Sequence, residues 1–198
     1  MPDYDRAYFD RWYRAPRTRL FTRAEIERRV RFAVAAAELI NERPLRRVLD
    51  VCCGEGHWQP MIHRLRPRAA WIGVDASEYA VARFGSRRRI LRGRFGELGS
   101  LGIRGRFDLI VCAGALYNID TAELRAGLRS IRTMLDGVAL LEIFTDRDEI
   151  VGHVKAMQRR SATDYERWLR EAGLVHVGMH CWVGSERGVE LTEFERGR

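Results

Sequence analysis

The chain has 198 residues, of which 46% are hydrophobic, and its formal net charge is +8. This length and composition are typical of one globular domain with a sizeable core, so we expect residues 1–198 to form a single domain. The amino terminus lacks the apolar core of a secretory signal, and no run is long enough to cross a membrane. We therefore expect a cytoplasmic protein without a membrane partner.

The basic charge raises the question of nucleic-acid binding. All basic residues except Lys155 are arginines, a skew that GC-rich coding explains more easily than selection for phosphate contacts. The cluster at 87–89 with Arg92 and Arg94 keeps nucleic acid as an alternative partner, against a solvated basic face. The four cysteines form no CxxC pair and predict free thiols, and we expect no metal site.

Aromatic and charged residues alternate in the first 21 positions, which predict an irregular segment. Thr22 and Glu25 then form a capping box, and Phe21 and Ile26 have the spacing of a hydrophobic staple. Apolar residues repeat from there at helical spacing until Pro44. We expect residues 1–44 to form an aromatic lid followed by a helix that packs on a sheet.

The segment from Arg47 to His57 is the most informative part of the sequence. A strand of bulky apolar residues ends in Asp50-Val51 and runs into Cys52-Cys53-Gly54-Glu55-Gly56. Glycines allow a backbone to approach a ligand closely, and such loops at the end of a first strand bind nucleosides in open α/β sheets. The segment predicts a cofactor loop.

Strands and helices alternate along the rest of the chain, which predicts a doubly wound parallel sheet. Five residues, 184–188, separate the last two expected strands. Because so short a connection cannot make a parallel crossover, the last strand must be antiparallel. The expected strands are 46–51, 71–75, 89–95, 107–112, 138–144, 174–183 and 189–194, and the expected helices are 57–66, 77–85, 120–137 and 163–173, the last capped by Thr163 and Glu166.

Two nucleotide cofactors compete for the loop. A dinucleotide site requires GxGxxG. Aligning Cys52, Gly54 and His57 to that pattern provides one glycine of three, and starting at Gly54 puts Gln59 at the third position, so NAD is disfavoured. An acid before the loop, Asp75 closing the second strand and an antiparallel final strand together resemble the class I S-adenosylmethionine (SAM) dependent methyltransferases. The resemblance covers about residues 45–195, and Cys52 stands where this family has the first glycine of GxGxG.

The resemblance implies a Rossmann-like α/β fold with a mostly parallel seven-stranded sheet, and SAM as the cofactor. In this family the acid that corresponds to Asp75 accepts hydrogen bonds from both ribose hydroxyls. Glu97 stands where an acid contacts the adenine amino group, and the residue that follows it packs on the ring. The implied cofactor contacts are Asp50, Cys52, Cys53, Gly54, Gly56, Asp75, Ala76, Glu97, Leu98, Cys112 and Ala113.

Three residues are candidates for catalysis on the acceptor side: Tyr117 beyond the fourth strand, Glu142 on the fifth and His153 after it. Methyl transfer needs a base only for some acceptors, so their roles differ with the acceptor. We expect O- or N-methylation of a small aromatic or apolar molecule. The alternatives are an RNA or protein methyltransferase, and a SAM-fold binding protein without activity.

Overall fold

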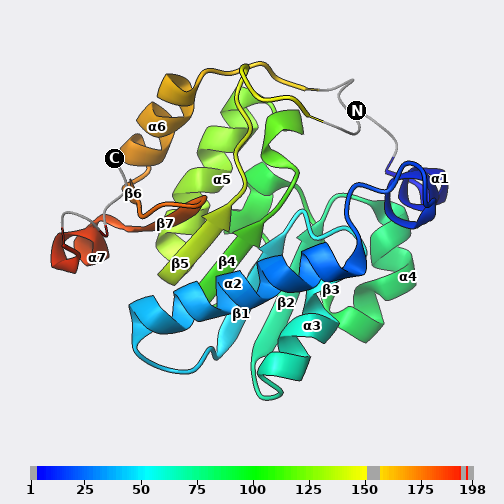
Figure 1. Cartoon of the computed structure of the whole chain (residues 1–198), viewed down its shortest axis with the longest axis horizontal. Coiled ribbons are helices and arrows are strands. Elements are labelled where there is room, and N and C mark those ends of the chain that lie inside the picture. Colours follow the sequence, from blue (N-terminus) through cyan, green and yellow to red (C-terminus); the bar gives the residue numbers. More distant parts are fainter. Residues whose placement is uncertain (1–3, 151–156, 193–194, 196–198) are drawn as a thin grey trace.

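The structure is a computed structural model that describes residues 4–150, 157–192 and 195. A seven-stranded sheet runs through its centre, with helices on both faces (Figure 1). Six strands are parallel and β7 is antiparallel to both of its neighbours, which confirms the predicted fold class. The strand order is β3-β2-β1-β4-β5-β7-β6, with β1 Arg47–Val51, β2 Ala70–Asp75, β3 Ile90–Arg92, β4 Phe107–Cys112, β5 Leu135–Leu141, β6 Leu174–His176 and β7 Cys181–Gly184.

The helices form two layers around this sheet. The helices α2, α3 and α4 pack on one face, while α5 and α6 pack on the other. Short helical turns connect several of the elements. The helical elements are α1 Arg6–Phe9, a π-helical turn at Asp10–Arg14, α2 Arg23–Asn41, α3 Trp58–Leu65, α4 Glu78–Arg88, 3-10 turns at Phe95–Ser100 and Leu116–Asn118, α5 Thr121–Met134, α6 Ala162–Glu171 and α7 Ser185–Glu190.

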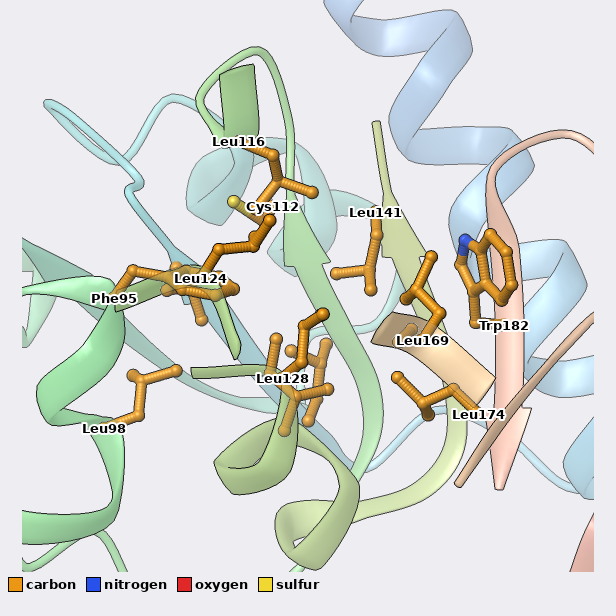
Figure 2. Close-up of a cluster of buried hydrophobic side chains, with 14 of the residues drawn as sticks. Phe95, Leu98, Cys112, Leu116, Leu124, Leu128, Leu141, Leu169, Leu174 and Trp182 are labelled. Atoms are coloured by element: carbon orange, nitrogen blue, oxygen red, sulfur yellow. The ribbon is translucent and has the colours of Figure 1, made fainter. Parts of the chain in front are cut away.

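A core of buried side chains fills the space between the sheet and the α5–α6 layer, as Figure 2 shows. Leu124 and Leu128 of α5 point toward the sheet, and Leu169 and Trp182 extend the same core toward β7. Burial of this apolar surface makes the main favourable contribution to the folding free energy and so holds the strand ends in register. The register in turn positions the loops that follow β1, β2 and β4.

Local signals set the start of most helices. The hydroxyl of Thr22 accepts a hydrogen bond from the Glu25 amide at 3.2 Å, and the Glu25 carboxylate accepts one from the Thr22 amide at 2.6 Å. The predicted capping box is thus confirmed. The predicted cap at Thr163 is wrong by two residues, because the hydroxyl of Ser161 accepts a bond from the amide of Asp164 and α6 begins at residue 162.

Two segments differ from the sequence prediction. Residues 6–14 are helical rather than irregular, since the Asp5 carboxylate accepts a hydrogen bond from the Tyr8 amide at 2.8 Å and starts α1. The single strand predicted over 174–183 is instead a hairpin of β6 and β7, turned by Gly178, Met179 and His180 with positive φ. In place of the predicted strand from residue 189, the structure has α7 and irregular chain over its described part.

No helix of the described chain is long and apolar enough to cross a membrane.

Candidate active site

A cavity of about 270 Å³ opens at the carboxyl ends of β1, β2 and β4. Because β1 pairs with β2 on one side and β4 on the other, this is the switch point where doubly wound sheets bind ligands. The amino-terminal helix covers it. The cavity is lined by Tyr4, Tyr8, Phe9, Tyr13, Cys52, Gly54, Asp75, Ala76, Gly93, Arg94, Phe95, Ala113, Gly114, Ala115, Asn118, Ile119, Asp120, Glu123 and Gln158.

Asp75 is the central acid of this cavity. Its side chain is only 9% exposed, and its two oxygens accept hydrogen bonds from the Gly54 amide at 2.6 Å and the Ser77 amide at 2.8 Å. Burial raises the pKa of Asp75, and these two backbone donors act in the opposite direction. Each carboxylate oxygen has two lone pairs, so both oxygens keep an acceptor site for a ligand donor.

Asp50 lies one strand away and is more deeply buried, with 3% exposure. Its Oδ2 atom has no hydrogen-bond partner among the described residues. Burial raises the pKa of Asp50 well above its ordinary value, and the nearby charge of Asp75 raises it further. The folded state therefore disfavours ionisation of this carboxyl more than the unfolded state does.

We expect Asp50→Asn to increase the free energy of unfolding at pH 7 by about 1 kcal/mol, because it replaces a carboxyl whose ionisation the folded state disfavours by a neutral group of the same shape. A carboxyl with a raised folded-state pKa loses its contribution to stability as the pH rises through that pKa. The increase in the free energy of unfolding should thus be largest near neutral pH, and it should shrink as the pH falls toward the ordinary pKa of a carboxyl group. Urea unfolding of both proteins at several pH values measures this, and a gain independent of pH would contradict it.

The loop after β1 requires unusual backbone angles. Gly54 and Gly56 have φ of 54° and 71°, and a Cβ on Gly54 would lie 3.0 Å from the ring of Phe9. Cys52 has φ of 56°, so a residue with a side chain occupies the left-handed region where the family has glycine. Its thiol hydrogen bonds with the thiol of Cys112, and this contact together with burial raises the pKa of Cys112 well above its ordinary value.

We expect Cys52→Val to lower the free energy of unfolding by about 1–2 kcal/mol, because a β-branched side chain is strained at positive φ. Cys52→Gly is the matched control, in which relief of strain offsets the lost thiol contact. Its stability should stay within about 0.5 kcal/mol of the parent chain. Chemical denaturation measures both, and a valine variant as stable as the glycine variant would show that the loop tolerates side chains freely.

The structure brings five of the expected cofactor residues together around the cavity: Cys52, Gly54, Asp75, Ala76 and Ala113. Asp50, Cys53, Gly56 and Cys112 lie in the layer around these residues and do not line the cavity. Glu97 is exposed, and its carboxylate accepts a hydrogen bond from the Arg94 amide at 2.9 Å. Leu98 is fully buried in the core, so Arg94 and Phe95 rather than Glu97 and Leu98 line this side of the cavity.

The amino-terminal segment packs directly over the loop, beside α4 (Figure 1). The ring of Phe9 lies 5.6 Å from that of Tyr79, and the ring of Tyr13 stacks on His57 at 5.6 Å. Arg14 binds Asp10 at 2.6 Å and the buried carboxylate of Glu55. This segment therefore covers one side of the cavity, and aromatic contacts and the Arg14–Glu55 ion pair hold it there.

A second group of polar residues lies at the ends of β4 and β5. Glu142 is 8% exposed; its Oε1 atom pairs with Arg29 at 2.7 Å, while Oε2 has no hydrogen-bond partner among the described residues. That free oxygen is 3.6 Å from where a Cβ on Gly114 would stand, and Gly114 lines the cavity. Tyr117 is buried beside Phe144, and burial raises its pKa. His153 lies outside the described residues.

Residues 48–137 match a family model described as a methyltransferase domain. This stretch includes the loop after β1, Asp75 and the end of β4, which together form one side of the cavity. Residues 48–137 therefore form a methyltransferase domain, and the sheet around it has the Rossmann-like methyltransferase fold. No curated protein sequence matches the chain significantly.

Solved structures of other methyltransferases share the fold. A SAM-dependent methyltransferase from Archaeoglobus fulgidus is 16% identical over 85% of this chain and 73% of its own, with a TM-score of 0.64. Magnesium protoporphyrin IX methyltransferase from Synechocystis PCC 6803, solved with bound SAH, is 17% identical over 86% of each chain, with a TM-score of 0.61. An O-methyltransferase from neocarzinostatin biosynthesis, solved with S-adenosyl-L-homocysteine and 1,4-dihydroxy-2-naphthoic acid, is 15% identical over 82% of this chain and 56% of its own, with a TM-score of 0.55.

Sequence reasoning missed one residue that shapes the site of this methyltransferase. Arg160 is 5% exposed, and its guanidinium donates hydrogen bonds to the carbonyl oxygens of Leu116, at 3.3 Å, and Ile119. It also contacts the hydroxyls of Thr121 and Tyr165, each at 3.3 Å. Arg160 thereby holds the loop after β4, which contributes Asn118 and Ile119 to the cavity. A lone arginine in a chain with many arginines carries no sequence signal for this role.

Proposed function

We propose that the protein transfers a methyl group from SAM to an oxygen or nitrogen atom of a small molecule. The observation that carries this proposal is the small cavity around Asp75, which the aromatic residues of the amino-terminal segment partly cover. A covered cavity suits a small acceptor, whereas RNA or protein substrates need an open approach to the reacting atom. Small-molecule pockets are commonly concave and aromatic, with a few polar groups that orient the ligand.

The residues of the cavity fit the donor. Asp75 would accept the ribose hydroxyls with the lone pairs that the Gly54 and Ser77 amides leave free. The adenine would lie beside Phe95 and Arg94, and the methionyl portion would follow the loop at Cys52 and Gly54 toward Ala113. When bound, SAM supplies an electrophilic methyl group on a sulfonium sulfur.

The acceptor would lie at the end of the cavity formed by the loop after β4. Asn118 lines this end, and its buried Oδ1 atom has no hydrogen-bond partner among the described residues. The free Oε2 atom of Glu142 lies beside Gly114 at the same end. A hydroxyl or amine acceptor could donate to either oxygen, and such a contact would orient its lone pair and receive its proton.

Arg29 occupies one of the two carboxylate oxygens of Glu142. Its guanidinium pairs with Oε1 at 2.7 Å and stacks over the ring of Phe21, with 3.9 Å from its central carbon to the ring centroid. The pair keeps one carboxylate oxygen occupied and the other available. Two structural neighbours, the magnesium protoporphyrin IX methyltransferase and the O-methyltransferase solved with 1,4-dihydroxy-2-naphthoic acid, are associated with aromatic small molecules, which supports an aromatic acceptor here.

Transfer of label from methyl-tritiated SAM tests this proposal. The purified chain is incubated with pools of aromatic hydroxyl, carboxyl and amine compounds, with bulk RNA and with a protein extract. Label in one or more small molecules supports the proposal, and label only in RNA or protein overturns it. Binding of SAM without transfer to any pool would instead favour the inactive binding protein.

A further inference from the structure

A second cavity, of about 570 Å³, lies on the other side of the amino-terminal segment from the Asp75 cavity. The segment after α1, the start of α2 and the start of α3 form its walls. Trp12, Tyr13 and Phe21 supply three aromatic rings to its lining. Tyr13 lines both cavities, and the other residues that line the second cavity have no role in the methyl transfer proposed above.

The charged groups of this second cavity are all cations or histidine. Arg19, Arg23, Arg64 and Arg88 line it together with His57, and no Asp or Glu of the described residues does. The Asp75 cavity has the opposite character, because Asp75, Asp120 and Glu123 line it with a single arginine. The linings of the two cavities therefore differ in the sign of their charge.

Nearby carboxylates neutralise only part of the positive charge that lines the second cavity. Arg64 lies 3.6 Å from Glu27, while Arg19 and Arg23 form no ion pair with any described carboxylate. Arg88 donates to the backbone oxygen of Glu55, and burial lowers the pKa of Arg88. A bound anion would compensate these cations, and charge-assisted bonds of this kind are stronger than neutral ones.

The aromatic side chains define the shape of a suitable ligand. Flat rings prefer to stack with other flat groups, and arginine guanidinium groups bind carboxylates through paired N–H donors. We propose that the second cavity is a binding site for a planar organic anion, such as an aromatic carboxylate. This inference goes beyond the proposed methyl transfer and does not depend on it.

The position of Tyr13 links this site to the cofactor cavity. Its ring stacks on His57, and His57 lies 3.3 Å from the carboxylate of Glu55 in the loop after β1. An anion held beside His57 would contact Tyr13, whose hydroxyl lies 3.7 Å from where a Cβ on Gly54 would stand. We expect occupancy of the second cavity to change the affinity for the cofactor, and by linkage the reverse.

Calorimetric titration with 2-naphthoate and its neutral analogue 2-naphthamide tests the site in the full chain. We expect 2-naphthoate to bind at least about tenfold more tightly than the amide, since one or two charge-assisted hydrogen bonds distinguish them. The double variant Arg19→Gln and Arg23→Gln should lose about tenfold in affinity for 2-naphthoate. Arg17→Gln is the matched control, because Arg17 is exposed in the same segment and does not line the cavity.

Each variant is first checked for an unchanged melting temperature. Equal affinity for acid and amide, or an unchanged affinity for 2-naphthoate in the double variant, would overturn the inference. Binding of S-adenosyl-L-homocysteine is measured separately on the same samples. Its absence would count against the proposed methyl transfer alone, since neither the titration nor the variants of the second cavity require the cofactor.

Discussion

Asp75→Ala should weaken the binding of S-adenosyl-L-homocysteine by about 100-fold or more. The expected loss corresponds to two hydrogen bonds between the ribose hydroxyls and a charged acceptor, each contributing about 1.5–3 kcal/mol. The buried position of the carboxylate strengthens both bonds, because little water competes for it. Isothermal calorimetry on the parent chain and the variant measures the effect directly.

Asp75→Asn is the control for this experiment. It keeps the side-chain shape and one oxygen acceptor but removes the charge, so its affinity should lie between those of the parent chain and the alanine variant. The Gly54 amide loses its acceptor in the alanine variant, and a melting temperature is therefore needed to show that the loop still folds. Parent-like affinity in a folded alanine variant would show that Asp75 does not hold the ribose.

Arg160→Ala should lower the free energy of unfolding by about 3 kcal/mol or more. The substitution removes the donors of the Leu116 and Ile119 carbonyl groups and leaves a cavity beside Trp168. Arg160→Lys should recover only part of the loss, because one ammonium group cannot reach the oxygens that a planar guanidinium reaches together. Urea denaturation of the parent chain and of the two variants measures these free energies of unfolding.

The adjacent Arg159 gives a matched control, because it is exposed and the described structure shows no ion pair for it. Arg159→Ala should change stability by less than about 0.5 kcal/mol. If Arg160→Ala also proves this mild, the buried guanidinium does not hold the loop after β4. A loss of cofactor affinity beyond the loss of stability would further indicate that this loop shapes the cavity.

Much of the fold could be predicted because its signals are local or periodic. The buried strand at 107–112 and the capping box at Thr22 depend on neighbouring residues only, and both are confirmed. The end of the chain was harder, because the turn at Gly178–His180 interrupts an apolar run that has the composition of one strand. The antiparallel direction of the last strand was correct, although the hairpin that produces it begins earlier than expected.

In the site, too, the residues that follow local patterns could be predicted, and those that depend on packing could not. The loop at Cys52–Gly56 directly follows β1, and Asp75 is the last residue of β2, so their convergence could be predicted from the parallel sheet alone. Arg160 acts from a residue 44 positions beyond Leu116, and only packing brings the two together. Similarly, whether Glu97 or Arg94 faces the cavity depends on how a short helical turn is oriented, which no periodic pattern determines.

Calorimetric titration of the folded parent chain with S-adenosyl-L-homocysteine tests whether the Asp75 cavity binds the SAM cofactor. We expect one molecule to bind per chain, with displacement by SAM and no comparable binding of NAD. A well-folded protein that binds neither S-adenosyl-L-homocysteine nor SAM would contradict this expectation.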